Sequence, residues 1–243
     1  MKPDSRLAAT TWEFENRALA FGLLFSVAFT SSTFDPQNVT VALGHALSHQ
    51  LHADGDRLAR ALFAFAAVVV STAALTRTWA SAYLEADVVY ASALKTASLV
   101  GDGPYRHTRN PLYLGNVLMA VGMGAMASRF GFLVLVGGMI VFSYRLIWRE
   151  EAELLRSQGE GYAAYLARVP RLMPALRPRV ESAGRRPDWT AGFRAESWYW
   201  GFAAALAAFA ITLSVKLFFG ILVASLGLFW VLTSRVPQGR ARG

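Results

Sequence analysis

Residues 110–148 read NPLYLGNVLMAVGMGAMASRFGFLVLVGGMIVFSYRLIW, and this stretch decides the fold. It holds two apolar segments, 110–128 and 130–144, separated by Arg129. A helix that crosses a bilayer needs about 17–25 mostly apolar residues, and residues 146–148 extend the second segment toward this length. A connection of about two residues permits only an antiparallel pair of helices. We therefore predict a membrane hairpin whose outer ends, Arg109 and Glu150, lie side by side on one face of the membrane.

Four further stretches are apolar over most of a bilayer's width, and with the hairpin they predict about six spans. They are residues 18–34, 61–76, 197–215 and 217–234, and the second can continue past Arg77 to Leu84. Of the 243 residues, 54% are hydrophobic and 16% are charged, whereas soluble domains carry about 25% charged residues. This composition excludes a disordered chain and predicts an all-α, polytopic membrane helix bundle.

The distribution of charge predicts the orientation in the membrane. The net charge is +8, and the basic residues flank the apolar stretches, which favours membrane topology over nucleic-acid binding. Arginines are densest in residues 145–194, so we expect this segment, both termini and a loop over residues 77–109 to be cytoplasmic. The first apolar stretch lacks a cleavage pattern and is expected to be a retained anchor. The chain is thus predicted to be a multi-pass protein of the inner (cytoplasmic) membrane; its oligomeric state stays open.

Two residue types limit the chemistry. The chain has no cysteine, which excludes disulfides, thiolate metal sites and a cysteine nucleophile. His45, His49 and His52 share one helical face, a pattern that fits either a metal site or, more commonly, the polar face of an interfacial helix. We predict no metal centre and leave the role of these histidines open.

Residues 101–115 read GDGPYRHTRNPLYLG and predict a loop followed by a helix start. Gly101, Gly103 and Pro104 disfavour a helix, whereas Pro111 suits a first helical turn. Unpaired N–H groups at a helix start attract an anion or a carboxylate. The loop can therefore cradle a polar cofactor, or it can be a connector with interfacial anchors.

Residues 149–171 read REEAELLRSQGEGYAAYLARVPR and place Glu150 and Glu151 directly after an apolar span. Paired acids beside a bilayer are costly unless they are solvated or bound to a cation. Tyr162 and Tyr165 follow on one face of a short helix. A solvated amphipathic helix on the membrane surface, which is common at such a position, also explains this pattern, but the hairpin geometry favours one composite site formed with the 101–115 loop.

Five short motifs in this region resemble the isoprenylcysteine carboxyl methyltransferase and phospholipid methyltransferase superfamily of integral membrane enzymes. They are Gly103-Pro104-Tyr105, Arg109-Asn110-Pro111-x-Tyr113-x-Gly115, Glu150-Glu151, Gly159-x-x-Tyr162-x-x-Tyr165 and Val169-Pro170-Arg171. The resemblance covers residues 94–174 and does not specify the substrate. Asn110 stands where the eukaryotic isoprenylcysteine enzymes have histidine, and asparagine cannot titrate.

The resemblance implies S-adenosylmethionine as the cofactor, bound at a cytoplasmic-face site. Arg109, Glu150 and Glu151 are implied as the catalytic residues. Arginine suits the cofactor carboxylate, and the acids suit its ammonium group or ribose hydroxyls. The implied cofactor-binding residues are Gly103, Tyr105, Arg109, Asn110, Pro111, Tyr113, Gly115, Glu150, Glu151, Tyr162 and Tyr165.

The methyl acceptor is expected to be hydrophobic or lipid-like and to reach the site from the bilayer. An isoprenylcysteine-like carboxylate, a phospholipid amine, a quinone-like lipid and a hydrophobic thiol all remain open. The alternatives are an NADPH-dependent enzyme similar to the sterol reductases and a non-enzymatic membrane scaffold. The predicted organisation is N-terminal spans (1–93), a methyltransferase-like core (94–174), a basic linker (175–196) and a C-terminal membrane hairpin with its tail (197–243).

Overall fold

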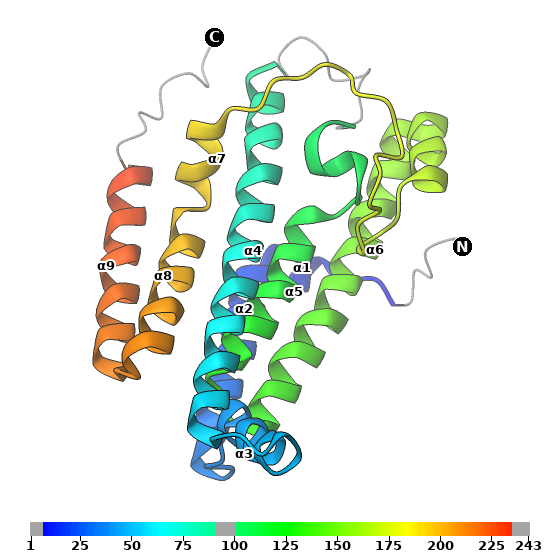
Figure 1. Ribbon diagram of the computed structural model, residues 1–243. Helices are drawn as coiled ribbons and strands as arrows, with labels where there is room; N and C mark the ends of the chain where they lie inside the picture. The colour runs from blue at the N-terminus through cyan, green and yellow to red at the C-terminus, as the bar shows by residue number, and fades with distance from the viewer. Residues whose placement is uncertain (1–6, 91–100, 235–243) are drawn as a thin grey trace.

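The computed structural model describes residues 7–90 and 101–234, and their regular structure is helical throughout (Figure 1). The all-α prediction is therefore confirmed for these residues. The helices, in chain order, are α1 (Thr11–Glu15), α2 (Arg17–Thr30), the short 3-10 helix η1 (Ser31–Thr33), α3 (Val39–Leu51), α4 (Gly55–Tyr90), the 3-10 helix η2 (Gly103–Arg106), α5 (Pro111–Gly124), α6 (Arg129–Arg168), α7 (Trp189–Ala195), α8 (Ser197–Thr212) and α9 (Val215–Ser234).

Three of the described helices are long and apolar enough to cross a membrane: Gly55–Leu84, Arg129–Arg168 and Val215–Ser234. The other three predicted spans coincide with α2, α5 and α8, which have 14, 14 and 16 residues. Helices of this size extend about 21–24 Å at 1.5 Å per residue, less than the hydrocarbon core. Six spans therefore stay a prediction, whereas a multi-pass helical membrane protein is well supported.

Helix α4 lies at the centre of the bundle, between α5 on one side and α8 on the other (Figure 1). Small residues allow the close approach of α5, because a Cβ on Gly122 would lie 2.4 Å from Val70 Cγ2 and 2.9 Å from the carbonyl oxygen of Ala66. Helix α9 packs mainly on α8, so the last two apolar stretches form a hairpin that turns at Leu213.

Two sequence predictions about helix limits meet different outcomes. The predicted loop at residues 77–109 is wrong at its start, because α4 continues to Tyr90. The charge of Arg77 does not end the span since Glu196 neutralises it inside the bundle. The predicted break at Gly159 is confirmed: this residue has φ 57° and ψ −131°, a conformation open almost only to glycine, and α6 kinks there.

The α5–α6 hairpin is antiparallel, as predicted, and its open end lies far from α3 (Figure 1). After α6 the chain runs through residues 169–188, called the strap below, across η2 toward α7. Backbone hydrogen bonds hold the strap in place, among them those from Ala175 N–H to the His107 carbonyl and from Asp188 N–H to the Ala82 carbonyl, both 2.9 Å. The predicted linker is therefore a pinned segment, and α7 forms its last part.

Candidate functional site

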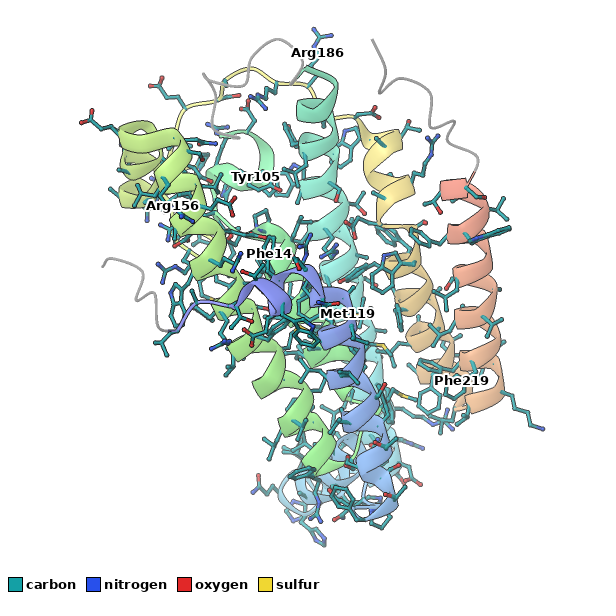
Figure 2. All side chains as sticks on the ribbon, turned by 180° about the vertical axis from the view of Figure 1, so that it is seen from behind. Phe14, Tyr105, Met119, Arg156, Arg186 and Phe219 are labelled. Carbon is teal, nitrogen blue, oxygen red and sulfur yellow. The ribbon has the colours of Figure 1, made fainter. Side chains whose placement is uncertain are left out.

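The candidate site is at the open end of the α5–α6 hairpin, where η2 and the strap meet the start of α5. Figure 2 shows Tyr105 of η2 at the same end of the bundle as Arg186 of the strap. Gly103 begins η2 with φ +56°, and a Cβ there would lie 2.3 Å from the Tyr83 ring of α4. Gly103 therefore allows η2 to lie directly on α4.

Glu151 forms a buried ionic cluster with two arginines. Its side chain is 1% exposed; Oε1 lies 2.8 Å from Arg109 Nη2, and Oε2 lies 2.9 Å from Arg171 Nη2. Arg109 also donates from Nη1 to the carbonyl oxygens of Leu166 (2.6 Å) and Val169 (2.9 Å) at the end of α6. The cluster joins the start of α5, the body of α6 and the beginning of the strap.

Asn110 belongs to the same cluster. Its amide nitrogen donates to the Arg171 carbonyl at 2.9 Å and, more weakly, to Glu151 Oε1 at 3.4 Å. Asn110 is the residue before α5, and Pro111 is the buried first residue of that helix. Asparagine thus serves this position as a neutral donor.

Glu150 has a different environment from its neighbour. It is half-buried, and its Oε1 accepts a hydrogen bond of 2.8 Å from the hydroxyl of Tyr113 on α5. Unlike Glu151, Glu150 forms no ion pair with an arginine within residues 7–90 and 101–234. Of the two predicted acids, Glu150 is thus the one whose carboxylate is not already neutralised by an arginine ion pair.

Tyr105 supplies a buried polar group without a partner. Its side chain is 8% exposed, and among the described residues its hydroxyl has no hydrogen-bond partner. Burial raises the pKa of this phenol above its ordinary value, mainly because the phenolate would lose its hydration, so the group stays protonated and able to donate. A buried hydroxyl of this kind calls for a ligand or a water molecule.

The predicted tyrosines, Tyr162 and Tyr165, lie near the end of α6, and Tyr165 contacts η2. The rings of Tyr162 and Tyr165 lie 5.9 Å apart in a small buried cluster with Val169. The Tyr165 hydroxyl donates to the Tyr105 carbonyl at 2.7 Å. Tyr165 thus helps to fix the position of Tyr105.

The last predicted residue, Gly115, allows contact between α5 and a polar cluster that the sequence analysis missed. A Cβ on Gly115 would lie 2.3 Å from Arg77 Cγ. Arg77 Nε lies 2.6 Å from Glu196 Oε2, and its Nη1 donates to Asn116 Oδ1 at 2.7 Å. The Tyr199 hydroxyl donates to the same Asn116 oxygen at 2.6 Å. The sequence does contain a signal for this cluster: Arg77 lies within one apolar stretch and Glu196 borders another, a pattern that indicates a buried charge pair.

The acid of the 101–115 loop was also missed. Asp102 is 1% exposed, and its carboxylate accepts hydrogen bonds from the Ser182 hydroxyl and from the backbone N–H groups of Ala183 and Arg185. His107, in the same loop, uses Nδ1 in a 2.8 Å hydrogen bond with the Ala175 carbonyl. Both residues hold the strap over η2.

The structure places the motif residues in three groups, and Gly115 lies apart from the Glu151 cluster, against Arg77. The first group is the ionic cluster of Glu151 with Arg109 and Asn110. The second consists of the glycines and the tyrosines of α6, which take part in close packing. The third is Glu150, Tyr113 and Tyr105, whose polar side chains could still bind a ligand. Cofactor contacts for any of them stay a prediction. In the part of the chain that the structure describes, no group of three or more His, Asp or Glu could hold a metal ion.

Comparisons with known proteins agree with the motif resemblance. The phospholipid methyltransferase family model matches residues 60–159, which include most of α4, all of η2 and α5, and α6 up to its kink. The cobalt-zinc-cadmium resistance protein CzcN of Cupriavidus metallidurans is 30% identical over 138 residues, 57% of this chain and 61% of that protein. The nickel-cobalt-cadmium resistance protein NccN of Alcaligenes xylosoxydans xylosoxydans is 28% identical over 123 residues, 51% of this chain and 54% of that protein.

The chain thus spans less than two thirds of the length of these curated relatives. No solved structure matches it significantly. The family match covers Tyr105, Arg109, Tyr113, Glu150 and Glu151 and ends at Gly159. Residues 60–159 therefore match the phospholipid methyltransferase family model, in agreement with the resemblance of the sequence motifs.

Proposed function

We propose that this protein is an integral membrane methyltransferase that uses S-adenosylmethionine to methylate a hydrophobic or lipid-like acceptor. The observation that supports it most is that the family-matched region holds both a half-buried carboxylate on Glu150 and a buried hydroxyl on Tyr105 that has no partner among the described residues. Both groups lie at the open end of the hairpin, where a ligand would complete their hydrogen bonding.

The residues present fit this cofactor. Glu150 would bind the cofactor's ammonium group, while the Tyr113 hydroxyl holds the Glu150 carboxylate in place through a 2.8 Å hydrogen bond. The Tyr105 hydroxyl would donate to an oxygen or nitrogen of the ligand. Arg109, Glu151 and Arg171 would act as positioning residues, because their ionic cluster fixes the two helix ends that carry the contacts. When bound, adenosylmethionine supplies an activated methyl group, and orientation is what the protein adds.

The test is calorimetric titration of the full chain in detergent, first with adenosylmethionine and then with NADPH. We expect saturable binding of adenosylmethionine and none of NADPH. Binding of NADPH alone would favour the reductase alternative. The absence of binding for both would favour a scaffold.

A substitution at Glu150 tests its assigned role. Glu150→Gln keeps the shape but removes the charge, and loss of a charged hydrogen bond should weaken adenosylmethionine binding by about ten- to a hundredfold. Glu153→Gln is the matched control, because Glu153 is exposed and one turn further along α6. Equal affinities in the two variants would remove Glu150 from the cofactor site.

The orientation of the site is part of the proposal, with the strap and both termini in the cytoplasm. Because the chain has no cysteine, single cysteines can report on it directly. Ala53 and Ala183 are exposed at opposite ends of the bundle. A membrane-impermeant maleimide should label Ala53→Cys in intact cells and Ala183→Cys only after permeabilisation. The reverse pattern would place the strap outside the cytoplasm.

A further inference from the structure

A pocket lies at the other end of the bundle from the candidate site. Its volume is about 460 Å³, and it is formed where α3, the start of α4 and the α8–α9 turn meet. Phe63, Phe209 and Met126 form its apolar part, and Leu213 and Val215 border it at the turn. None of these residues belongs to the methyltransferase motifs.

The polar side of the pocket carries one charge of each sign. Asp56 and Arg60 are one helical turn apart on α4, and both line the pocket. They do not form an ion pair with each other within the described residues; Asp56 lies 3.8 Å from His45 Nε2, and Arg60 Nη1 donates to the Ile211 carbonyl at 3.2 Å. Arginine has five donors, so most of its hydrogen-bonding capacity remains for a ligand.

The pocket also lies level with the ends of two candidate membrane spans, where phospholipid headgroups would be expected. The apolar part of α4 begins beside Arg60, and α9, the most lipid-exposed candidate span, begins at Val215 next to Lys216. A ligand here meets charged groups on one side and aromatic and aliphatic side chains on the other. This gradient matches an amphiphile that lies along the bilayer normal.

We propose that this pocket binds one zwitterionic, amine-bearing phospholipid, with its phosphate on Arg60, its ammonium group on Asp56 and an acyl chain along Phe63 and Phe209. The separated opposite charges select this class over an anionic lipid, whose headgroup would meet Asp56 unfavourably. Such a lipid would hold the α8–α9 turn against α4, at the point where Leu213 has φ 53°, an unusual conformation for leucine. The proposal is independent of methyl transfer.

The test uses native mass spectrometry of the full chain, released from detergent, after addition of phosphatidylethanolamine or phosphatidylglycerol with the same acyl chains. We expect a single-lipid adduct that favours phosphatidylethanolamine. Arg60→Gln should weaken adducts of both lipids by about tenfold or more, because each phosphate loses a charged hydrogen bond. Asp56→Asn should abolish the preference while leaving phosphatidylglycerol adducts intact.

Arg57→Gln is the matched control, since Arg57 is exposed on α4 but does not line the pocket. Val215→Trp fills the mouth of the pocket without a change of charge and should also remove the adduct, and a circular dichroism melt checks that each variant is folded. Preferred binding of phosphatidylglycerol, or an equal loss in Arg57→Gln and Arg60→Gln, would overturn the proposal. So would unchanged adducts in both Arg60→Gln and Val215→Trp.

Discussion

Replacing Glu151 with glutamine is expected to lower the free energy of unfolding by about 3–5 kcal/mol, because it leaves the largely buried Arg109 and the half-buried Arg171 together without a counter-charge. Arg109 and Arg171 are 8% and 24% exposed at their side chains, and both meet the same carboxylate. Glutamine keeps the volume but can accept only through one oxygen. The measurement is unfolding by denaturant in detergent micelles, followed by circular dichroism.

The control for this experiment is Glu153→Gln, which changes an exposed acid on the same helix and should shift stability by less than about 0.5 kcal/mol. A stable Glu151→Gln protein that nevertheless fails to bind adenosylmethionine would mean that Glu151 acts on the cofactor directly. The experiment therefore separates a positioning residue from a cofactor ligand.

Replacing Arg77 with methionine is expected to destabilise the protein by a similar amount, about 3–5 kcal/mol, since it leaves Glu196 as an uncompensated buried charge. The Glu196 side chain is 5% exposed, and Arg77 provides two of its hydrogen bonds, at 2.6 and 2.9 Å. Among residues 7–90 and 101–234, Ser81 would remain as the side-chain donor to this carboxylate, at 2.7 Å. The same denaturant titration measures the effect.

The double variant, Arg77→Met with Glu196→Leu, completes the thermodynamic cycle. Removing both charges together should restore most of the stability, because apolar side chains of similar volume replace a buried ion pair nearly without loss. Losses that simply add up in the double variant would show that the two residues stabilise the fold separately.

The sequence predicted the α5–α6 hairpin correctly because the relevant information is local. Two apolar segments and a short connection determine an antiparallel pair, and its open end then brings Arg109 close to Glu151. The lengths of the helices were less predictable. Helix α5 ends at Gly124 because distant Asn38 and Thr40 donate hydrogen bonds to the Ala125 carbonyl in the following turn.

The partners of the charged residues were the least predictable part of the candidate site. Arg171 stands in a recognised motif, but nothing in the sequence shows that it shares Glu151 with Arg109. From the sequence alone the strap looks like a basic linker. Its contacts with Asp102 are made largely by backbone N–H groups, which every residue except proline has, so no residue pattern predicts them. Such contacts depend on the tertiary fold and not on residue type.

The distance along the chain between Arg77 and Glu196 has a consequence for biogenesis. The two residues are 119 positions apart, so during synthesis α4 is made long before its counter-charge exists. Until α7 and α8 arrive, the central helix must hold an arginine among apolar neighbours, an unfavourable state for a membrane helix. A nascent chain that stops at residue 159 would contain the whole family-matched region and still lack this neutralisation. The residue that completes the folding of α4 in this way, Glu196, thus lies outside the family-matched region, between α7 and α8.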